Sequence, residues 1–229
     1  MSGDKQRTVG GRTHDRLQHD ILYGEFAAGD RLNIGRLCAR YHVSANTLRE
    51  VLVRLSQVGL VEAEGQKGFR VAPANLKKLE ELTRLRQLLE VDGALQSIRN
   101  GDLDWESNLA GAYYKLCRTE EDMLAGGTNV ESWTASDLAF HLALIDACNS
   151  ALHLQVYEET FLQFRRYVVQ ELKTHGFRGE PLHREHEEIY QAALARDEAR
   201  LRRALELHIN VYLKRERAKS ASEPVKAGA

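Results

Sequence analysis

The sequence predicts a mostly α-helical protein, with an N-terminal winged helix-turn-helix plus a C-terminal six-helix antiparallel bundle. Residues 13–73 show the order helix, helix, helix, hairpin, and almost every stretch after Pro73 repeats apolar residues at helical spacing. A single proline, Pro181, lies between residues 75 and 220. The expected segments are a flexible tail at 1–12, the winged helix-turn-helix at 13–73, the helical domain at 74–217 and a disordered tail at 218–229.

Turn signals separate the first helices of the N-terminal part. A helix over Thr13–Leu22 ends at a glycine, and a loop over 24–30 leads to a short helix near Ile34–Tyr41. A longer helix begins at Ser44 and ends near residue 58. The Ser44 hydroxyl is suited to cap it, because it can accept a hydrogen bond from an unpaired amide of the first turn.

Two short strands follow this helix. They are expected over residues 60–63 and 68–71, on either side of a turn between Gly65 and Gly68. In a winged helix-turn-helix, the second helix of the helix-turn-helix pair enters the major groove with its N-terminal residues facing the base edges. The order of elements is therefore typical of a module that binds double-stranded DNA.

The C-terminal part has helical periodicity throughout. Pro181 is compatible with this pattern, because proline suits the first turn of a helix. No period of 30–50 residues repeats, which excludes a solenoid. The helices are expected over residues 75–100, 103–124, 133–147, 152–174, 181–195 and 197–214.

The composition is that of a soluble globular protein, with 43% hydrophobic and 28% charged residues. No apolar run approaches the ~20 residues that cross a bilayer, and the N-terminus lacks the apolar core of a signal peptide. Three widely spaced cysteines indicate reduced thiols, so we expect a cytoplasmic protein without contact to a membrane. Residues 1–75 carry a small excess of basic side chains, which fits a module that contacts phosphates.

A set of potential metal ligands lies in the helical part. Asp137 and His141 are four residues apart and share one helix face, while His186 and His208 lie on the last two helices. Three imidazoles and one carboxylate are a suitable ligand set for a divalent transition metal. The alternative at this point is three histidines that are hydrogen-bonded within the core.

Residues 13–73 resemble the DNA-binding domain of GntR-family regulators, through the stretches 24–33 and 43–72. We expect a symmetric homodimer, formed through the helical domain at 74–217, because its two recognition helices would then match a palindromic operator. The sequence departs from the family's pattern at Ala45, where arginine is usual, and at Gly35, where a charged residue is common. A protein-interaction module is the alternative. The residues implied to contact DNA are Ser44, Asn46, Thr47 and Arg49 in the recognition helix, and Lys67 and Gly68 at the wing tip.

The helical part resembles the effector domain called FCD, in the VanR-like branch of the FadR subfamily of GntR regulators. The matching stretches are 82–95, 136–150 and 183–209. In that family an aspartate and three histidines hold a metal. The resemblance therefore implies one divalent ion per chain (zinc, nickel or manganese) at Asp137, His141, His186 and His208.

The same resemblance implies a small organic acid as effector. Arg86 stands where many family members have an arginine that meets the effector's carboxylate, although an exposed pair with Glu90, one turn later, is the alternative. Asn149 is either a donor in the effector pocket or a helix C-cap. His183, three residues before His186, is a weaker candidate ligand.

These features predict a transcription repressor, not an enzyme, whose affinity for DNA is controlled by an allosteric effector bound at a metal site. Two other classes of function agree less well with these residues. A metal-dependent hydrolase is disfavoured, because no HExxH or comparable motif supplies a general base. A ligand-independent DNA-binding protein would leave polar metal ligands inside an apolar bundle unexplained.

Overall fold

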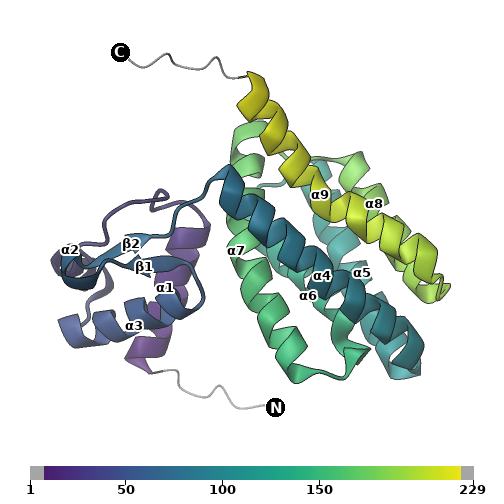
Figure 1. The fold of residues 1–229 in the computed structure, drawn as a ribbon, viewed down its shortest axis with the longest axis horizontal. Helices are drawn as coiled ribbons and strands as arrows, with labels where there is room; N and C mark the ends of the chain where they lie inside the picture. The colour runs from purple at the N-terminus through teal and green to yellow at the C-terminus, as the bar shows by residue number, and fades with distance from the viewer. Residues whose placement is uncertain (1–7, 223–229) are drawn as a thin grey trace. The chain divides into compact units, whose positions relative to one another are not determined.

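A computed structural model describes residues 8–222 of the chain (Figure 1). The chain divides into two compact units, of which the first ends at Asn75 and the second begins at Leu76. The first unit is a small helical module with a two-stranded hairpin, and the second is entirely helical within the described residues. The expected fold class, a winged helix-turn-helix followed by a helical domain, is confirmed.

The first unit has the expected order of elements. Its residues 34–41 and 45–57 match the predicted helix-turn-helix closely, and His42 makes the turn between them in a left-handed conformation (φ 56°). Leu48, Leu52 and Leu55 are fully buried. The elements are α1 (Val9–Leu22), α2 (Ile34–Tyr41), α3 (Ala45–Gln57), β1 (Val61–Ala63), the short 3-10 helix η1 (Gly65–Lys67) and β2 (Phe69–Val71).

Helix α1 begins earlier than the sequence indicated. It starts at Val9, because the Thr8 hydroxyl caps it by accepting a hydrogen bond from the amide of Gly11 (3.1 Å). Residues 9–12 are therefore helical and do not belong to a flexible tail. The remainder of the expected tail lies outside the described residues.

The hairpin forms the wing. Strands β1 and β2 are antiparallel, with Val61 opposite Val71 and Ala63 opposite Phe69. The connection at the tip is η1, followed by Gly68 with φ 97°, a conformation that L side chains rarely adopt. A glycine is therefore required where the wing turns back.

The second unit consists of long helices joined by short connections. Helix α6 begins three residues before its predicted start, since the Asn129 side chain caps it through the amide of Ser132 (2.9 Å). Helix α9 continues through residues 218–222, which were expected to be disordered. The rest of that tail lies outside the described residues. The elements are α4 (Leu76–Asn100), α5 (Leu103–Leu124), α6 (Val130–Ile145), the 3-10 helix η2 (Asp146–Cys148), α7 (Ala151–His175), α8 (Glu180–Leu194) and α9 (Glu198–Ser222).

Packing of these helices encloses one apolar core. Helix α4 lies against α7 and α9, α5 against α6, and α8 against α9 (Figure 1). Three phenylalanines from α6 and α7, namely Phe140, Phe161 and Phe164, are buried at its centre. Each of the six helices also contributes at least one buried polar side chain, and these side chains are consequently shielded from water.

Cys148 is buried and Cys38 and Cys117 are half-buried, and none of the three is paired in a disulfide. Across the part of the chain that the structure describes, none of the helices combines the length and the apolar character needed to span a membrane.

Candidate metal centre and DNA-binding surface

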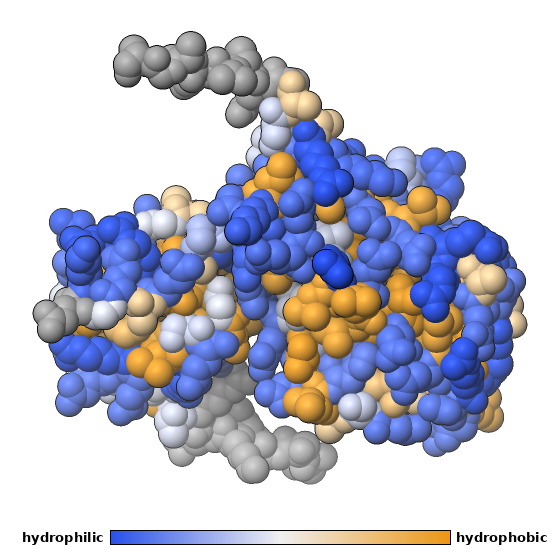
Figure 2. All heavy atoms as spheres, viewed as in Figure 1, coloured by the Kyte–Doolittle hydropathy of each residue, from blue (hydrophilic) through white to orange (hydrophobic). Residues whose placement is uncertain are grey.

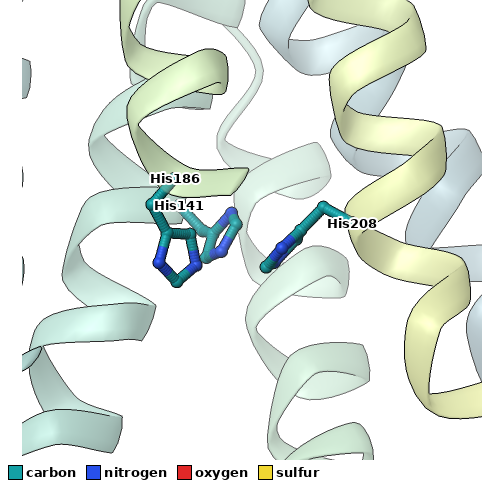
Figure 3. A group of neighbouring side chains, drawn as sticks. All are labelled: His141, His186 and His208. Atoms are coloured by element: carbon teal, nitrogen blue, oxygen red, sulfur yellow. The ribbon is translucent and has the colours of Figure 1, made fainter. Parts of the chain in front are cut away.

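Three buried histidines from three helices meet inside the second unit. His141 comes from α6, His186 from α8 and His208 from α9, and their rings face a common point (Figure 3). One ring nitrogen of each lies within 4.8 Å of the others. The first and the last of these histidines, His141 and His208, are 67 residues apart in the sequence.

Asp137 lies one helical turn before His141 and borders the same point. Its Oδ1 is 3.6 Å from Nε2 of His141 and 3.3 Å from Nε2 of His186. The carboxylate is almost fully buried. It therefore adds a hard oxygen donor next to two of the three imidazoles, as a mixed nitrogen and oxygen site for a divalent ion requires.

Each imidazole also contacts a glutamate, called here its outer glutamate, on the side of the ring that faces away from the common point. In all three rings the contacting atom is Nδ1, which leaves Nε2 directed to the centre. Such outer carboxylates fix the orientation of a ligating histidine and make it a better donor. The contacts are His141 Nδ1 to Glu90 Oε1 (2.5 Å), His186 Nδ1 to Glu120 Oε1 (2.6 Å) and His208 Nδ1 to Glu185 Oε2 (3.0 Å).

Every one of these glutamates has a second partner. Glu120 also contacts Nδ1 of His183 (2.7 Å), so His183 faces the carboxylate and not the centre. Glu90 and Glu185 also contact a second side chain besides their histidine. Tyr157 donates a hydrogen bond to Glu90 (2.8 Å), and Arg178 forms an ion pair with Glu185 (2.5 Å). Each carboxylate is thus held in place independently of its histidine.

The electrostatics of the cluster suit a metal ion. Burial lowers the pKa of His208 to about 3, so this imidazole is neutral and its lone pair is available. Burial also opposes the charged form of His186, but contacts with Asp137 and Glu120 outweigh it and raise the pKa to about 9. Nε2 of His186 is nevertheless buried without a hydrogen-bond partner among the described residues. A divalent cation bound here would replace the second proton of the charged imidazole and accept the lone pair of Nε2.

Arg86 lies beside the cluster and is completely buried. Its Nε donates a hydrogen bond to Glu90 Oε2 (2.8 Å), and its Nη2 lies 3.4 Å from Nε2 of His141. The Cζ atom of Arg86 lies 4.6 Å from the ring centre of Phe161 and 4.9 Å from that of Phe164, within the range of cation–π contacts. The pair with Glu90 exists, but it is part of the core, so the alternative of an exposed pair is wrong.

Asn149 is located away from the buried side chains. It is exposed at the end of η2, where its backbone is left-handed (φ 58°), a conformation that asparagine tolerates better than most residues. The structure therefore favours the capping alternative for Asn149, and no contact connects its side chain to the histidines.

The predicted DNA-contacting residues lie at the start of α3 and at the wing tip. Ser44 is exposed and caps α3 through the amide of Thr47 (3.2 Å), while Asn46 and Arg49 are exposed on the first turns. Lys67 is exposed at the end of η1 and Gly68 follows it. The side chains of Ser44, Asn46, Arg49 and Lys67 are thus accessible to a ligand such as DNA, and that of Thr47 is half-buried. Ser44 has the additional role of capping α3.

Two protein families match the chain. The family described as "Bacterial regulatory proteins, gntR family" matches residues 10–71, and the family described as "FCD domain" matches residues 81–211. Each matched range lies within one of the two units of the structure. The FCD match alone covers more than half of the chain.

Relatives and solved structures agree with these matches. The HTH-type transcriptional regulator BphR of Paraburkholderia xenovorans is 36% identical, covering 86% of this chain and 80% of its own. The HTH-type transcriptional repressor GlaR of Escherichia coli is 30% identical, covering 84% and 89%. The structure of E. coli McbR/YncC is similar in fold, with a TM-score of 0.75, 18% identity and coverage of 94% and 100%. None of these proteins is an enzyme by name, which disfavours the hydrolase alternative.

Proposed function

The chain belongs to the GntR family of bacterial regulatory proteins and carries an FCD domain, and from this premise we propose that it is a transcription repressor controlled by a small organic acid. The acid would bind at a divalent metal ion in the helical domain and change the affinity of the protein for its operator. The observation that carries the proposal is the convergence of three buried imidazoles and Arg86 on one point.

The winged helix-turn-helix supplies the contact with double-stranded DNA. Helix α3 would lie in the major groove, with Asn46, Thr47 and Arg49 directed to the bases and phosphates and Lys67 of the wing beside them. Two chains are required for a palindromic operator, because a two-fold axis of the protein must match that of the DNA. We therefore propose a homodimer.

The metal would be held by Nε2 of His141, His186 and His208 and by the carboxylate of Asp137. These four residues could hold a divalent ion such as zinc, nickel or manganese, which would supply a positive charge and a bond to an anionic oxygen. The chain's own task is to keep the imidazoles oriented, and the outer glutamates do this from the Nδ1 side.

Arg86 would provide the second contact to the effector. Its Nε is already used by Glu90, but the end of the guanidinium that carries Nη2 faces the histidines. A carboxylate between this end and the metal would be fixed in orientation by a charge-assisted hydrogen bond, which favours organic acids over neutral compounds. Cation–π contacts with Phe161 and Phe164 stabilise the guanidinium in this position.

The test combines metal analysis with DNA binding. Elemental analysis is expected to find close to one divalent ion per chain, and a set of small organic acids is then added to the operator complex. One of them should change the operator affinity by the coupling free energy, typically about 1–3 kcal/mol. If operator binding is unchanged by every acid that raises the melting temperature, the protein is a ligand-independent DNA-binding protein instead.

The first prediction concerns Arg49. Arg49→Ala is expected to weaken specific operator binding by about 1–3 kcal/mol, which is about 5- to 150-fold, if the guanidinium contacts a base edge. The measurement is operator affinity at fixed salt, with Arg118→Ala on α5 as a control that removes the same charge from the other unit. Equal affinities of the two variants would exclude Arg49 from the interface.

The second prediction concerns the outer glutamates. Glu120→Gln keeps the shape of the side chain but weakens its contact with Nδ1 of His186, so metal affinity is expected to fall about 10- to 100-fold. Competition with a chelating dye measures this. The neighbouring Glu121, which is exposed and contacts Arg118, provides the control Glu121→Gln. Glu120 has no role in the site if the two variants bind metal equally well.

A further inference from the structure

The two tryptophans of the chain are both buried, and they differ in the hydrogen bonding of the indole N–H. Trp105 donates its Nε1–H to the carbonyl oxygen of Ala143 (2.9 Å). Trp133 is 1% exposed, and its Nε1 has no hydrogen-bond partner among the described residues. Buried donors are almost always paired, so an unpaired one indicates an acceptor that does not belong to the protein chain.

Trp133 lines a small cavity in the helical unit. The cavity has a volume of about 10 Å³, roughly the space that one water molecule needs. Of the described residues that form its wall, only Trp133 has a buried polar side-chain atom without a partner. The cavity therefore suits an oxygen atom that accepts a hydrogen bond. Its wall comes from α6, α7, α8, α9 and the segment between α7 and α8, and includes Trp133, Val168, Phe177, Arg178, Leu182 and Tyr212.

The cavity adjoins the candidate metal centre. In three helices a residue of the cavity wall lies four positions from a candidate ligand, which is about one helical turn or roughly 5 Å. The wall residue precedes the ligand in α6 and α8 and follows it in α9, which is antiparallel to α8 (Figure 1). The wall residues accordingly meet on one side of the centre. The pairs are Trp133 and Asp137 on α6, Leu182 and His186 on α8, and Tyr212 and His208 on α9.

The segment between α7 and α8 covers part of this cavity. Phe177 packs edge-on against Trp133, with ring centres 5.4 Å apart, and Arg178 holds the segment to α8 through an ion pair. Gly176 and Gly179 lie at its two ends, both with positive φ (77° and 70°). Because glycine has the fewest conformational restrictions, the segment can turn at these two positions and make room for a group larger than water.

We infer that this cavity receives the far end of the effector, and that Trp133 determines specificity there by donating its indole N–H to an oxygen atom of that end. The inference rests on the proposed function, because it extends the site in which an organic acid binds at the metal. One carboxylate would lie at the metal and Arg86, and a second oxygen-bearing group about one helical turn away. The effector would therefore be an acid with a hydroxyl or a second carboxylate at its other end.

A hydrocarbon end would fit this cavity less well. It would displace any water and leave the N–H of Trp133 without an acceptor. A site built to hydrogen-bond one group of a ligand discriminates strongly against the analogue that lacks it. The difference between the two classes of acid thus depends on a single N–H, which one substitution can remove.

Trp133→Phe removes this N–H and retains an aromatic ring beside Phe177. Melting temperatures of the metal-loaded, full-length protein are measured against the concentration of unbranched acids from butanoate to hexanoate, and of the same chains ending in a hydroxyl or a second carboxylate. An oxygen-ended acid is expected to bind about tenfold more tightly than the methyl-ended acid of equal length, and Trp133→Phe should abolish this preference. Trp105→Phe, which removes an N–H already bonded to Ala143, is the matched control and should keep the preference.

A second measurement leaves Trp133 in place. In Trp105→Phe it is the only tryptophan of the chain, so the fluorescence emission reports on its surroundings alone. An oxygen-ended acid at saturation is expected to shift the emission, because the N–H gains an acceptor. If Trp133→Phe fails to bind metal, this emission decides the question by itself.

The outcomes separate this inference from the proposed function. Acids that bind with the same preference in Trp133→Phe as in the unsubstituted chain, or that leave the emission of Trp133 unchanged, would overturn the inference alone, and the N–H would then be satisfied by a water molecule. A methyl-ended acid that binds as tightly as its oxygen-ended counterparts would do the same. Metal-loaded protein that binds none of the acids would overturn both the inference and the proposal of an organic acid effector.

A different surface of the same unit carries no ligand argument. Hydrophobic side chains are visible over α4 and α7 in Figure 2, and Leu88 of α4 (62% exposed) is among the exposed ones. The cavity at Trp133 is distinct from this surface, since no residue of α4 belongs to its wall.

Discussion

Replacing both His186 and His208 by alanine is expected to abolish stoichiometric metal binding. Binding free energies of structural zinc sites are about 10–16 kcal/mol, so the loss of two of four ligands corresponds to more than a thousandfold in affinity. The melting temperature should fall with it, because an ion that binds only the folded protein stabilises it. Elemental analysis after gel filtration and thermal unfolding with and without a chelator measure the two effects.

The outer glutamates keep a partner in this double variant, so a loss of metal can be attributed to the missing imidazoles. Glu120 retains His183, and Glu185 retains Arg178, so neither carboxylate is left as an unpaired buried charge. His183→Ala is the matched control, since it removes a contact of the same carboxylate without touching the centre. It should keep its metal. Full occupancy in the double variant would show that the cluster consists of core histidines, as the sequence alone also allowed.

The second large effect is expected at Arg86. Arg86→Ala leaves the carboxylate of Glu90 buried without its cation, which typically costs about 3–5 kcal/mol of folding free energy. The pKa of Glu90 is held below its usual range, against the effect of burial, by Arg86 and His141, so this carboxylate is ionised at neutral pH. Urea unfolding at pH 7 measures the loss. Arg99→Ala, which breaks an exposed pair with Glu198, should change the free energy of unfolding little.

Because Arg86→Ala is destabilising, a different substitution must test the effector. Arg86→Lys keeps a positive charge near Glu90 but cannot make the planar, two-pronged contact of a guanidinium. It should fold, bind metal and operator, and respond to the acid only at concentrations about tenfold higher or more. A wild-type response would assign the effector's carboxylate to the metal alone. Stability equal to wild type in Arg86→Ala would contradict the burial of the pair.

Local signals were sufficient for most of the fold. The helix that begins after Ser44 was predicted nearly to the residue, since its cap and its apolar stripe agree. The start of α1 was missed because Gly10 and Gly11 are poor helix formers. Tertiary contacts overcome that preference. Helix α1 packs on α3, and the guanidinium of Arg54 donates to the carbonyl of Gly10 (3.3 Å).

The candidate site was only partly predictable. Imidazoles at apolar positions, such as His141 and His208, stand out in a sequence because a polar side chain in a buried stripe needs a reason. Glu120 and Glu185 gave no such signal, as each sits among other charged residues that occupy solvent-exposed helix faces. The burial of Glu120 and the partial burial of Glu185 follow from the packing of α8 against α5 and α9, which no local pattern describes. The distance between Arg86 and His141 is likewise a product of packing.

Helix α4 begins at Leu76, the residue at which the second unit starts, and it carries Arg86 in its third turn. The proposed ligand contact therefore lies ten residues, or about 15 Å of continuous helix, from the covalent connection to the DNA-binding unit. A ligand that displaced Arg86 along the axis of α4 would displace that connection as well, because the hydrogen-bonded turns between them transmit axial movement. Coupling between the metal centre and the operator would then need no element other than this helix.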